Sequence, residues 1–323
     1  MAPLATTYQD EKLGTIASLK SGALSAEIAV DCGSNLISLK TDERELIHTN
    51  REALLEHAYT GCFVLYPFPN RIRDRKFTFE NTSYSLENYP KRVDDNALIH
   101  GLAHDAEWNI DGVPTVEGDT ALVTTSMHWD SSQEYFDVFP VPSKLTLTYR
   151  LSELGLRIEY LVTNTSDKRM PFGFALHPSF KRLSGDETML TLPANQVMRM
   201  DKDLLPTNEL LDLDLVMFRQ FDLRKPVPVN AALRLDHVFT DLIPDEPAVI
   251  SYPTENLEVS IRASADCKFI VLHTLGKDRT IEIEPQTCST DAVNANDPGA
   301  NGLLTLEPEA THVGFIEYSV KNT

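Results

Sequence analysis

The stretch that decides the fold is IEIEPQTCSTDAVN, residues 281–294. Its first residues alternate, so a strand here would turn Ile281 and Ile283 toward a core and Glu282 and Glu284 toward the opposite face. Pro285 follows at once and has no N–H group for a ladder, which predicts that the strand ends here or lies at a sheet edge. A carboxylate at such a place is suited to proton transfer, although a solvated strand face would have the same pattern.

A second alternating stretch is PFGFALHPSF, residues 171–180. Positions 172, 174 and 176 are bulky and apolar, which predicts that they are buried in the core. Gly173 and Ala175 share the other face and should leave room for a molecule to lie against the sheet. His177 then stands at the edge of that space, and Pro178 is expected to stop the strand. A histidine here is a candidate for proton transfer, and an ordinary histidine on a polar face is the alternative.

Alternation of the same kind runs through most of the chain. Residues 145–151 and 156–162 alternate on either side of a turn and predict an antiparallel hairpin. Other expected elements are a hairpin at 77–86, a helix at 51–59 and, at 201–229, a loop with one helical turn. Short strands with 14 Gly and 19 Pro between them, and no linker or repeat, predict one large antiparallel all-β sandwich with few short helices. We expect a single domain over residues 1–323.

The composition restricts the partners and the compartment. Lys and Arg number 29 against 48 Asp and Glu, for a net charge of −19. This charge argues against nucleic acid and against an anionic membrane surface, and favours a small neutral ligand. The four cysteines are scattered, which indicates free thiols rather than a disulfide framework or a zinc site. Without a visible signal peptide or membrane span, we expect a cytoplasmic protein, as a monomer or a dimer.

Several other polar residues are candidates for a site. Arg71 follows two prolines in a loop and could grip hydroxyl or carboxylate oxygens with its fixed donors, or form a surface salt bridge. His100 and His104 have the i, i+4 spacing of zinc-binding helices, but Gly101 and the lack of a helix signal argue against a metal site. Asp236 could accept hydrogen bonds from sugar hydroxyls or cap a strand.

Together these pieces resemble the aldose 1-epimerase (mutarotase) family. The motifs that carry the resemblance occur in the family's order: NRI at 70–72, HG at 100–101, FALHPSF at 174–180, LDHVF at 235–239 and IEPQTCSTDAVN at 283–294. The resemblance implies a galactose-mutarotase-like β-sandwich that interconverts the α and β anomers of an aldose without a metal or organic cofactor.

The resemblance also implies roles for individual residues. Glu284 would be the general base and His177 the general acid, while Arg71, His100 and Asp236 would bind the sugar. The chain departs from the galactose-specific pattern, since FALHPSF replaces a TNH-type stretch and Leu102 follows His100-Gly101. The preferred aldose therefore stays open.

Three alternatives remain beside a free-sugar epimerase. The HGLAH pattern also resembles the hexose-6-phosphate epimerase branch, for which candidate phosphate-binding cations are Arg73, Arg75, Lys91, Arg92, Lys181 and Arg182. A non-catalytic carbohydrate-binding protein on the same fold would not need an acid–base pair. A glycosidase that used Glu282 and Glu284 would need its two carboxyl groups to flank a glycosidic bond, which neighbours on one strand face would not do.

Overall fold

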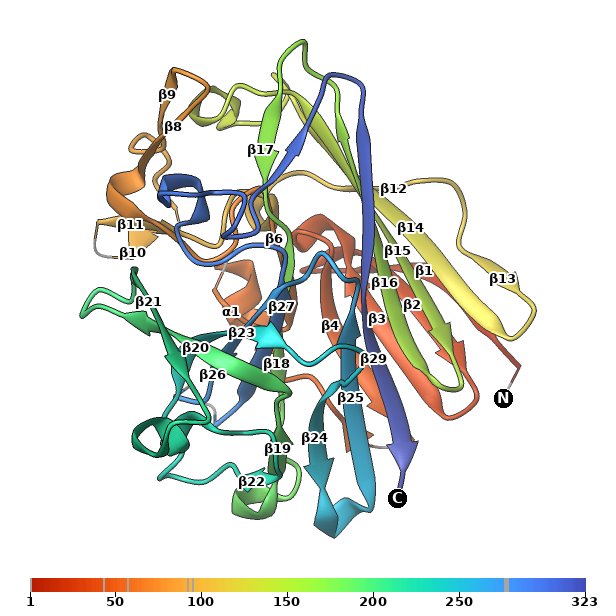
Figure 1. The fold of residues 1–323 in the computed structure, drawn as a ribbon. Helices are drawn as coiled ribbons and strands as arrows, with labels where there is room; N and C mark the ends of the chain where they lie inside the picture. Colours follow the sequence, from red (N-terminus) through yellow and green to blue (C-terminus); the bar gives the residue numbers. More distant parts are fainter. Residues whose placement is uncertain (1, 43, 57, 92, 95, 276–278) are drawn as a thin grey trace.

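The computed structural model describes residues 2–42, 44–56, 58–91, 93–94, 96–275 and 279–323. Within these residues, two large antiparallel sheets of 12 and 10 strands form the molecule. They lie against each other as two layers, and three small sheets sit at their margins (Figure 1). The predicted fold class, an antiparallel all-β sandwich with few short helices, is confirmed.

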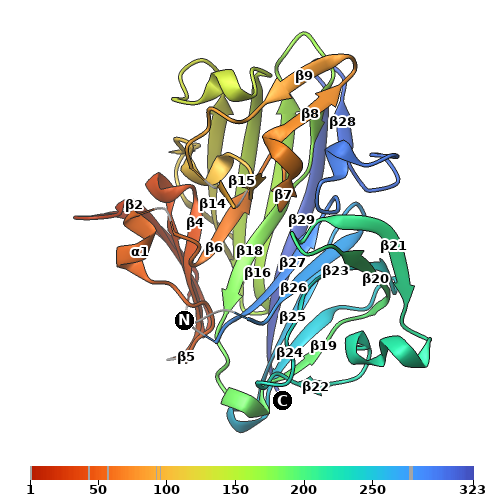
Figure 2. The same cartoon turned by 90° about the vertical axis from the view of Figure 1, so that its left-hand side faces the viewer.

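The larger sheet contains the strands that position the site. Its order is β1 (Leu4–Asp10), β2 (Gly14–Ser21), β3 (Leu24–Ala29), β4 (Asn35–Thr41), β6 (Cys62–Leu65), β18 (Ala175–Phe180), β27 (Ile281–Gln286), β26 (Phe269–His273), β23 (Asp236–Leu242), β20 (Ala194–Met200) and β21 (Pro206–Asp212), with β5 (Arg44–Glu45) beside β4. Figure 2 shows β18, β27, β26 and β23 side by side in the middle of this sheet.

The second large sheet has the order β12 (Asn109–Ile110), β14 (Thr120–Trp129), β15 (Ser143–Ser152), β16 (Gly155–Asn164), β29 (Thr311–Asn322), β25 (Leu257–Ala263), β24 (Ala248–Tyr252), β19 (Met189–Thr191) and β22 (Val227–Pro228), with β13 (Thr115–Glu117) beside β14. The small sheets are β10 (Val93–Asp94), β11 (Ala97–Ile99) and β7 (Arg71–Ile72); β17 (Met170–Phe172) and β28 (Leu304–Leu306); and β8 (Lys76–Phe79) and β9 (Thr82–Ser85).

Helical structure is short among the residues described. The α-helix α1 covers Arg51–Leu55, and the Asn50 side chain caps it by accepting hydrogen bonds from the N–H groups of Glu52 and Ala53. The 3₁₀ turns are Val30–Cys32, Arg73–Arg75, Ala103–Asp105, Phe136–Val138, Gly185–Glu187, Val216–Phe221, Pro253–Glu255 and Ala292–Asn294. No described helix has the length and apolar character that a membrane crossing requires.

The alternation in the sequence explains the core. Strands β15 and β16 pair from Ser143 with Asn164 to Ser152 with Gly155, and every second residue of β15 is buried. The buried faces of both large sheets meet in one hydrophobic cluster, which includes Leu176 and Ile283 from one sheet and Leu147 and Ile158 from the other. Burial of this apolar surface is the main force that holds the two layers together.

A few buried polar contacts fix the two layers against each other. The Tyr149 hydroxyl in β15 donates to the carbonyl oxygen of Ser34 at 2.5 Å, and the Ser34 and Thr125 hydroxyls lie 2.8 Å apart. The Tyr318 hydroxyl in β29 lies 3.5 Å from Sγ of Cys62 in β6. These groups satisfy one another inside the core and set the alignment of the sheets.

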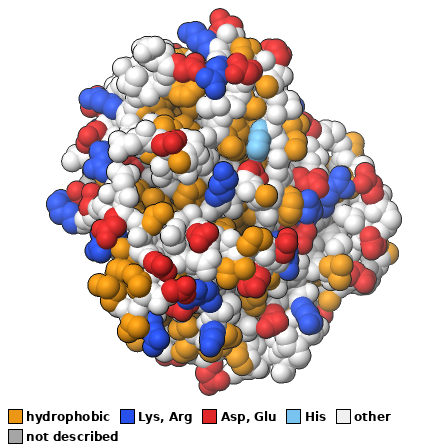
Figure 3. All heavy atoms as spheres, viewed as in Figure 1, with side chains coloured by type: hydrophobic (Ala, Val, Ile, Leu, Met, Phe, Trp, Pro, Cys, Tyr) orange, Lys and Arg blue, Asp and Glu red, His pale blue; other side chains and the backbone are white. Residues whose placement is uncertain are grey.

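The surface carries both signs of charge. Figure 3 shows acidic and basic side chains interspersed on one face, with hydrophobic side chains between them. This face therefore has no block of a single charge.

Candidate active site

Two adjacent strands in the middle of the larger sheet bring the predicted acid and base together. Strand β18 pairs antiparallel with β27, with Ala175 opposite Gln286 and Ser179 opposite Glu282. The same register places His177 opposite Glu284, on the sheet face that turns away from the core. Ile281 and Ile283 are fully buried on the other face, as the alternation predicted. Residues more than 100 positions apart in sequence thus become cross-strand neighbours.

The prediction that Pro178 and Pro285 end their strands, or mark a sheet edge, is wrong. Strand β18 continues past Pro178 to Phe180, and β27 continues past Pro285 to Gln286 with a neighbour on each side. The paired positions of β18 and β27 lie above and below these prolines, and not at them. The prolines keep their register with the outer neighbours, Pro178 opposite Cys62 in β6 and Pro285 opposite Ile270 in β26. Their missing N–H groups coincide with the interruption of the ladder between β18 and β27, so the prolines are tolerated inside a sheet.

The expected open space beside Gly173 and Ala175 is also wrong. A Cβ atom at Gly173 would lie 2.4 Å from Sγ of Cys288 and 2.8 Å from Cδ of Pro69, so protein atoms occupy that side of the residue. Ala175 is fully buried against Phe63 and Leu65. The glycine is therefore needed for close packing, and the ligand space begins at His177.

His177 and Glu284 form a close, buried pair. Nε2 of His177 lies 3.3 Å from Oε1 of Glu284, and the two side chains are 13% and 2% exposed. Burial lowers the pKa of His177 to about 4, although the negative charge of Glu282 acts in the opposite direction. Burial, together with the charge of Glu282, raises the pKa of Glu284 well above its ordinary value. Low polarity thus disfavours charge on both groups, and at neutral pH the pair holds a single proton.

A second histidine–glutamate pair lies beside the first. Nδ1 of His273 is 2.9 Å from Oε2 of Glu282, and the Thr280 hydroxyl donates to the other oxygen of Glu282. The pairing of β26 with β27 sets His273 opposite Glu282. Although burial alone would lower the pKa of His273, the hydrogen bond and charge of Glu282 raise it. This pair places a polar, hydrogen-bonded group directly next to Glu284.

A cavity of about 460 Å³ opens above these strands. All five residues singled out from the sequence line it: His177, Glu284, Arg71, His100 and Asp236. The other lining residues named by the structure are His48, Tyr59, Asn70, Val93, Asp94, Ile99, Ser179, Val271, His273, Thr280 and Glu282. The volume falls in the range that small-molecule sites occupy, and the lining is rich in groups that bind hydroxyls.

Arg71 stands at one wall of the cavity in a fixed orientation. Its Nε and Nη2 atoms donate to Oδ2 of Asp94 at 2.8 and 2.7 Å, and its Nη1 atom donates to Oδ1 of Asn70 at 3.3 Å. The Arg71 side chain is only 14% exposed. These contacts hold the guanidinium group in place without using all of its donors.

His100 is held over His177 by an unusual backbone. Both His100 and Gly101 have left-handed conformations, with φ of 67° and 70°. A Cβ atom at Gly101 would lie 2.5 Å from the carbonyl oxygen of Tyr66, so only glycine fits at this position. The ring of His100 then lies edge-on to that of His177, with centroids 4.9 Å apart. The HG motif therefore positions a ring at the cavity wall.

His104 does not join His100 in the cavity. It lies in the 3₁₀ turn Ala103–Asp105, is buried, and packs its ring 4.7 Å from that of Phe63. Within the described ranges, no group of three or more His, Cys, Asp and Glu side chains is arranged to hold a metal ion. In the HGLAH motif, His100 therefore lines the cavity, whereas His104 packs in the core.

Sequence reasoning missed part of the lining. His273 ends strand β26 on the same face as Val271, and its pairing with Glu282 and with Asp236 follows from sheet order, which the sequence does not give. Alternation alone could have marked His273 as a residue of the open face. Tyr59 and His48 also line the cavity. They come from loops before β6, and no sequence pattern indicated that they would reach the site.

The candidate phosphate-binding cations lie elsewhere. Five of them are within the described residues and none of these lines the cavity, whereas Arg92 lies outside the described residues. Arg73 is paired with Asp291 and Asp201, Arg182 with Asp186, and Lys91 lies over the ring of Tyr135.

Comparison with known proteins identifies the family. A model of the aldose 1-epimerase family matches residues 15–319. The uncharacterized protein YihR of Escherichia coli (strain K12) is 27% identical over 310 residues, which is 94% of this chain and 92% of YihR. A galactose mutarotase-like protein of Clostridium acetobutylicum has a TM-score of 0.88 at 22% identity, with 100% and 99% of the two chains covered.

A further similar structure is galactose 1-epimerase of Lactobacillus acidophilus NCFM, with a TM-score of 0.77 at 18% identity and 99% of both chains covered. At these identities the structural comparisons establish the fold, and the family model covers nearly the whole chain. The protein belongs to the aldose 1-epimerase family.

Proposed function

We propose that the protein is an aldose 1-epimerase that interconverts the α and β anomers of a free aldose, with Glu284 as general base and His177 as general acid. The observation that carries the proposal is the contact of these two groups, 3.3 Å apart, in the wall of a cavity of about 460 Å³. The hydroxyl oxygen O1 and the ring oxygen O5 of a pyranose are bonded to the same carbon, so adjacent acid and base groups can serve both.

The reaction needs two proton transfers and no covalent intermediate with the protein. The Glu284 carboxylate takes the proton of O1, the imidazolium of His177 gives a proton to O5, and the C1–O5 bond breaks to leave an aldehyde. After C1 turns about the C1–C2 bond, O5 attacks its other face. Glu284 then returns a proton to O1 while His177 recovers the proton of O5. General acid–base catalysis of this kind typically contributes about 10²–10⁴-fold.

The electrostatics of the pair suit this cycle. With the ring closed, the active form has a carboxylate and an imidazolium; with the ring open, both groups are uncharged. Each form carries one proton on the pair, so the cycle never requires two charges of the same sign. Because burial lowers the pKa of His177 and raises that of Glu284, the uncharged form is the more stable one, so the proton transfers that open the ring also remove the disfavoured ion pair.

The remaining lining residues are proposed to bind the sugar. Arg71, His100 and Asp236 present a guanidinium, an imidazole and a carboxylate to the cavity, which together can donate to and accept from ring hydroxyls. The second pair, His273 and Glu282, adds two more hydrogen-bonding groups and a negative charge beside Glu284.

The charges of the cavity favour a neutral sugar over a sugar phosphate. Its described lining has four carboxyl groups, Asp94, Asp236, Glu282 and Glu284, and a single guanidinium, Arg71, which is already paired with Asp94. A phosphate dianion would be repelled by the ionised carboxyl groups, and the described lining offers no second Arg or Lys side chain to bind it.

A polarimetric screen tests the proposal. Freshly dissolved α-glucose, α-galactose, a pentose and glucose 6-phosphate would each be followed with and without the protein. We expect acceleration with at least one free aldose and none with the phosphate. Absence of acceleration with every free aldose would contradict the proposed function.

A further inference from the structure

The short strand β7, which carries Arg71, is supported on both of its edges. On one edge it pairs with β11. On the other edge it meets Asp291, whose N–H group donates to the carbonyl oxygen of Arg71 at 2.9 Å and whose Oδ1 accepts from the N–H group of Arg73 at 3.1 Å. The C=O group of one residue and the N–H group two residues later leave a strand on the same side, so Asp291 bonds to β7 as a neighbouring strand would.

The Asp291 side chain serves β7 and not its own turn. Asp291 directly precedes the 3₁₀ turn Ala292–Asn294, a place where an Asp side chain often caps the turn, but here it makes no capping hydrogen bond. Its backbone is left-handed, with φ of 57°, a conformation that Asp adopts more readily than most residues. With this backbone, the N–H group and the carboxylate of one residue both reach the same edge of β7.

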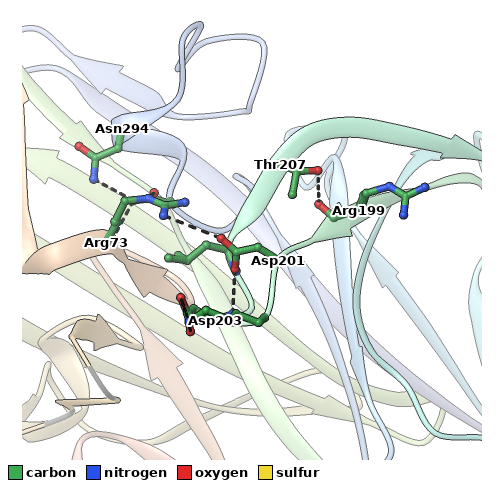
Figure 4. Close-up of polar contacts among 9 residues, drawn as sticks. Arg73, Arg199, Asp201, Asp203, Thr207 and Asn294 are labelled. Atoms are coloured by element: carbon green, nitrogen blue, oxygen red, sulfur yellow. Dashed lines mark hydrogen bonds and ion pairs between the residues drawn. The ribbon is translucent and has the colours of Figure 1, made fainter.

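Further contacts hold the Asp291 carboxylate in this position, and the residue is only 8% exposed. Its Oδ1 also accepts from Nδ2 of Asn294 at 2.8 Å, and its Oδ2 lies 3.4 Å from Nε of Arg73. The Asn294 amide donates as well to the carbonyl oxygen of Lys76 at 3.0 Å. Figure 4 shows Arg73 between Asn294 and Asp201, and Nη1 of Arg73 lies 3.9 Å from Oδ2 of Asp201. Contacts from several parts of the chain thus fix this edge of β7.

We propose that Asp291 is a positioning residue that holds Arg71 at the wall of the sugar cavity. Arg71 lines the cavity and Asp291 is not among its described lining residues, so Asp291 acts through the backbone of residues 71–73. The same support extends to His100, because the carbonyl oxygen of Asn70 accepts from the His100 N–H group at 2.8 Å. The inference goes beyond the proposed function but rests on it, since Arg71 is proposed to bind the sugar.

Loss of the carboxylate should loosen β7 on one edge only. The N–H group of Arg73 would lose its acceptor, while the pairing with β11 would remain. The guanidinium group of Arg71 would then be held less well in the orientation that Asp94 and Asn70 now define. A sugar contact weakened equally in the bound substrate and in the transition state raises KM and leaves kcat nearly unchanged.

A double-mutant cycle with Arg71 tests the inference. Asp291→Gly removes the carboxylate and keeps a residue that adopts positive φ without strain, whereas Asp291→Asn keeps an acceptor oxygen. Asp245→Gly, at an exposed aspartate with φ of 62°, is the matched control. Each substitution is made in the wild type and in Arg71→Ala. Titration calorimetry gives the Kd of glucose and of galactose, and polarimetry gives kcat and KM.

We expect Asp291→Gly to raise Kd and KM about three- to tenfold, as loss of a polar contact would, with less than a twofold change in kcat. Asp291→Asn should restore most of the affinity, and Asp245→Gly should be silent. In Arg71→Ala, Asp291→Gly should add less than a twofold effect, because no guanidinium group remains to be positioned. An unchanged Kd in Asp291→Gly, or the same factor in both backgrounds, would overturn the inference.

Two further measurements make the test independent of turnover and of one variant. Hydrogen exchange followed by mass spectrometry should be faster in Asp291→Gly for peptides that contain residues 72–74, and unchanged exchange would overturn the inference. If Asp291→Gly does not fold, Asn294→Ala, at an exposed residue, removes one hydrogen bond to the same carboxylate. It should raise Kd about twofold in the wild type and not in Arg71→Ala, and an unchanged Kd would overturn the inference.

The outcome for the proposed function is read separately. Absence of anomer interconversion by the wild type with every free aldose would contradict the epimerase. The Kd cycle and the exchange rates would still decide whether Asp291 positions Arg71, because neither depends on catalysis.

Discussion

Nε2 of His177 and Oε1 of Glu284 lie 3.3 Å apart on neighbouring central strands, and their side chains are only 13% and 2% exposed. Each side chain is fixed by the sheet rather than by a loop. The ring of His177 stacks on that of Phe63, with centroids 4.5 Å apart, and Glu284 accepts from the amide of Gln286 at 3.0 Å. The pair is thus held in position by the protein itself, as the proposed proton transfer requires.

Replacement of the proposed acid should reduce turnover strongly. His177→Asn keeps a polar side chain but cannot transfer a proton, so kcat should fall by about 10²–10⁴-fold, with a smaller change in KM. Polarimetry on freshly dissolved α-glucose measures both constants. His128→Asn, the same change at an exposed histidine of β14, should be silent. A kcat for His177→Asn within threefold of the wild type would exclude this histidine as the acid.

The pH dependence should reflect the displaced pKa values of the pair. The active pair holds one proton, so the acidic limb of kcat/KM should lie near pH 4, the pKa of His177, and the alkaline limb at the raised pKa of Glu284. An acidic limb near the ordinary histidine value of 6.5 would contradict the electrostatic account.

Glu282→Gln should move both limbs to lower pH. The negative charge of Glu282 raises the pKa of Glu284 and of His177, and the substitution removes that charge while it keeps the shape of the side chain. The pH profile of kcat/KM measures the shift. Glu11→Gln, at an exposed turn, is the control and should leave the profile in place. Unmoved limbs in Glu282→Gln would show that the second pair does not tune the first.

Arg71 should contribute mainly to substrate binding. Arg71→Ala removes the guanidinium that Asp94 and Asn70 hold at the cavity wall, so KM should rise about tenfold, which corresponds to the loss of a charge-assisted hydrogen bond. The effect on kcat should be smaller. Initial rates over a range of α-glucose concentrations separate the two constants, and an unchanged KM would remove Arg71 from the proposed sugar site.

The buried carboxyl group should destabilise the native state at neutral pH. Folding raises the pKa of Glu284, so its ionised form is less stable in the native protein than in the unfolded chain at any pH above its ordinary value. Glu284→Gln should therefore raise Tm at pH 7.5 by about 1.5–3 °C, which corresponds to about 1–2 kcal/mol for a chain of 323 residues. The gain should shrink toward pH 4, where the carboxyl group is protonated in both states. A lower Tm at pH 7.5 would contradict the sign of this shift.

Much of the sheet architecture could be predicted from local patterns. The hairpin of β15 and β16 follows from strict alternation, since burial is the same for every second residue. The predicted loop at 201–229 proved to contain strand β21 (Pro206–Asp212), whose residues are largely exposed and so lack an apolar face. The predicted helix at 51–59 ends at Leu55, because only Leu54 in it is buried and one such contact does not extend a helix.

The site was predictable only where residue type and alternation sufficed. His177 and Glu284 were found because each is an ionisable residue on the face opposite a buried one. Arg71, His100 and Asp236 were candidates from residue type, and the resemblance to the family assigned them to one sugar site, although they come from separate sheets and loops. The second pair, His273 with Glu282, depends on the pairing of β26 with β27, and strand order is a property of the whole fold. The strand ends predicted at Pro178 and Pro285 were wrong because the sequence does not show where the hydrogen-bond ladder between two strands is interrupted.

The most direct test of the central claim is the activity of Glu284→Gln on freshly dissolved α-glucose or α-galactose, followed by polarimetry with sugar binding measured in parallel. The account predicts that anomer interconversion falls by at least about 10²-fold while the variant stays folded and still binds the sugar. A Glu284→Gln protein that interconverts the anomers at the wild-type rate would contradict it.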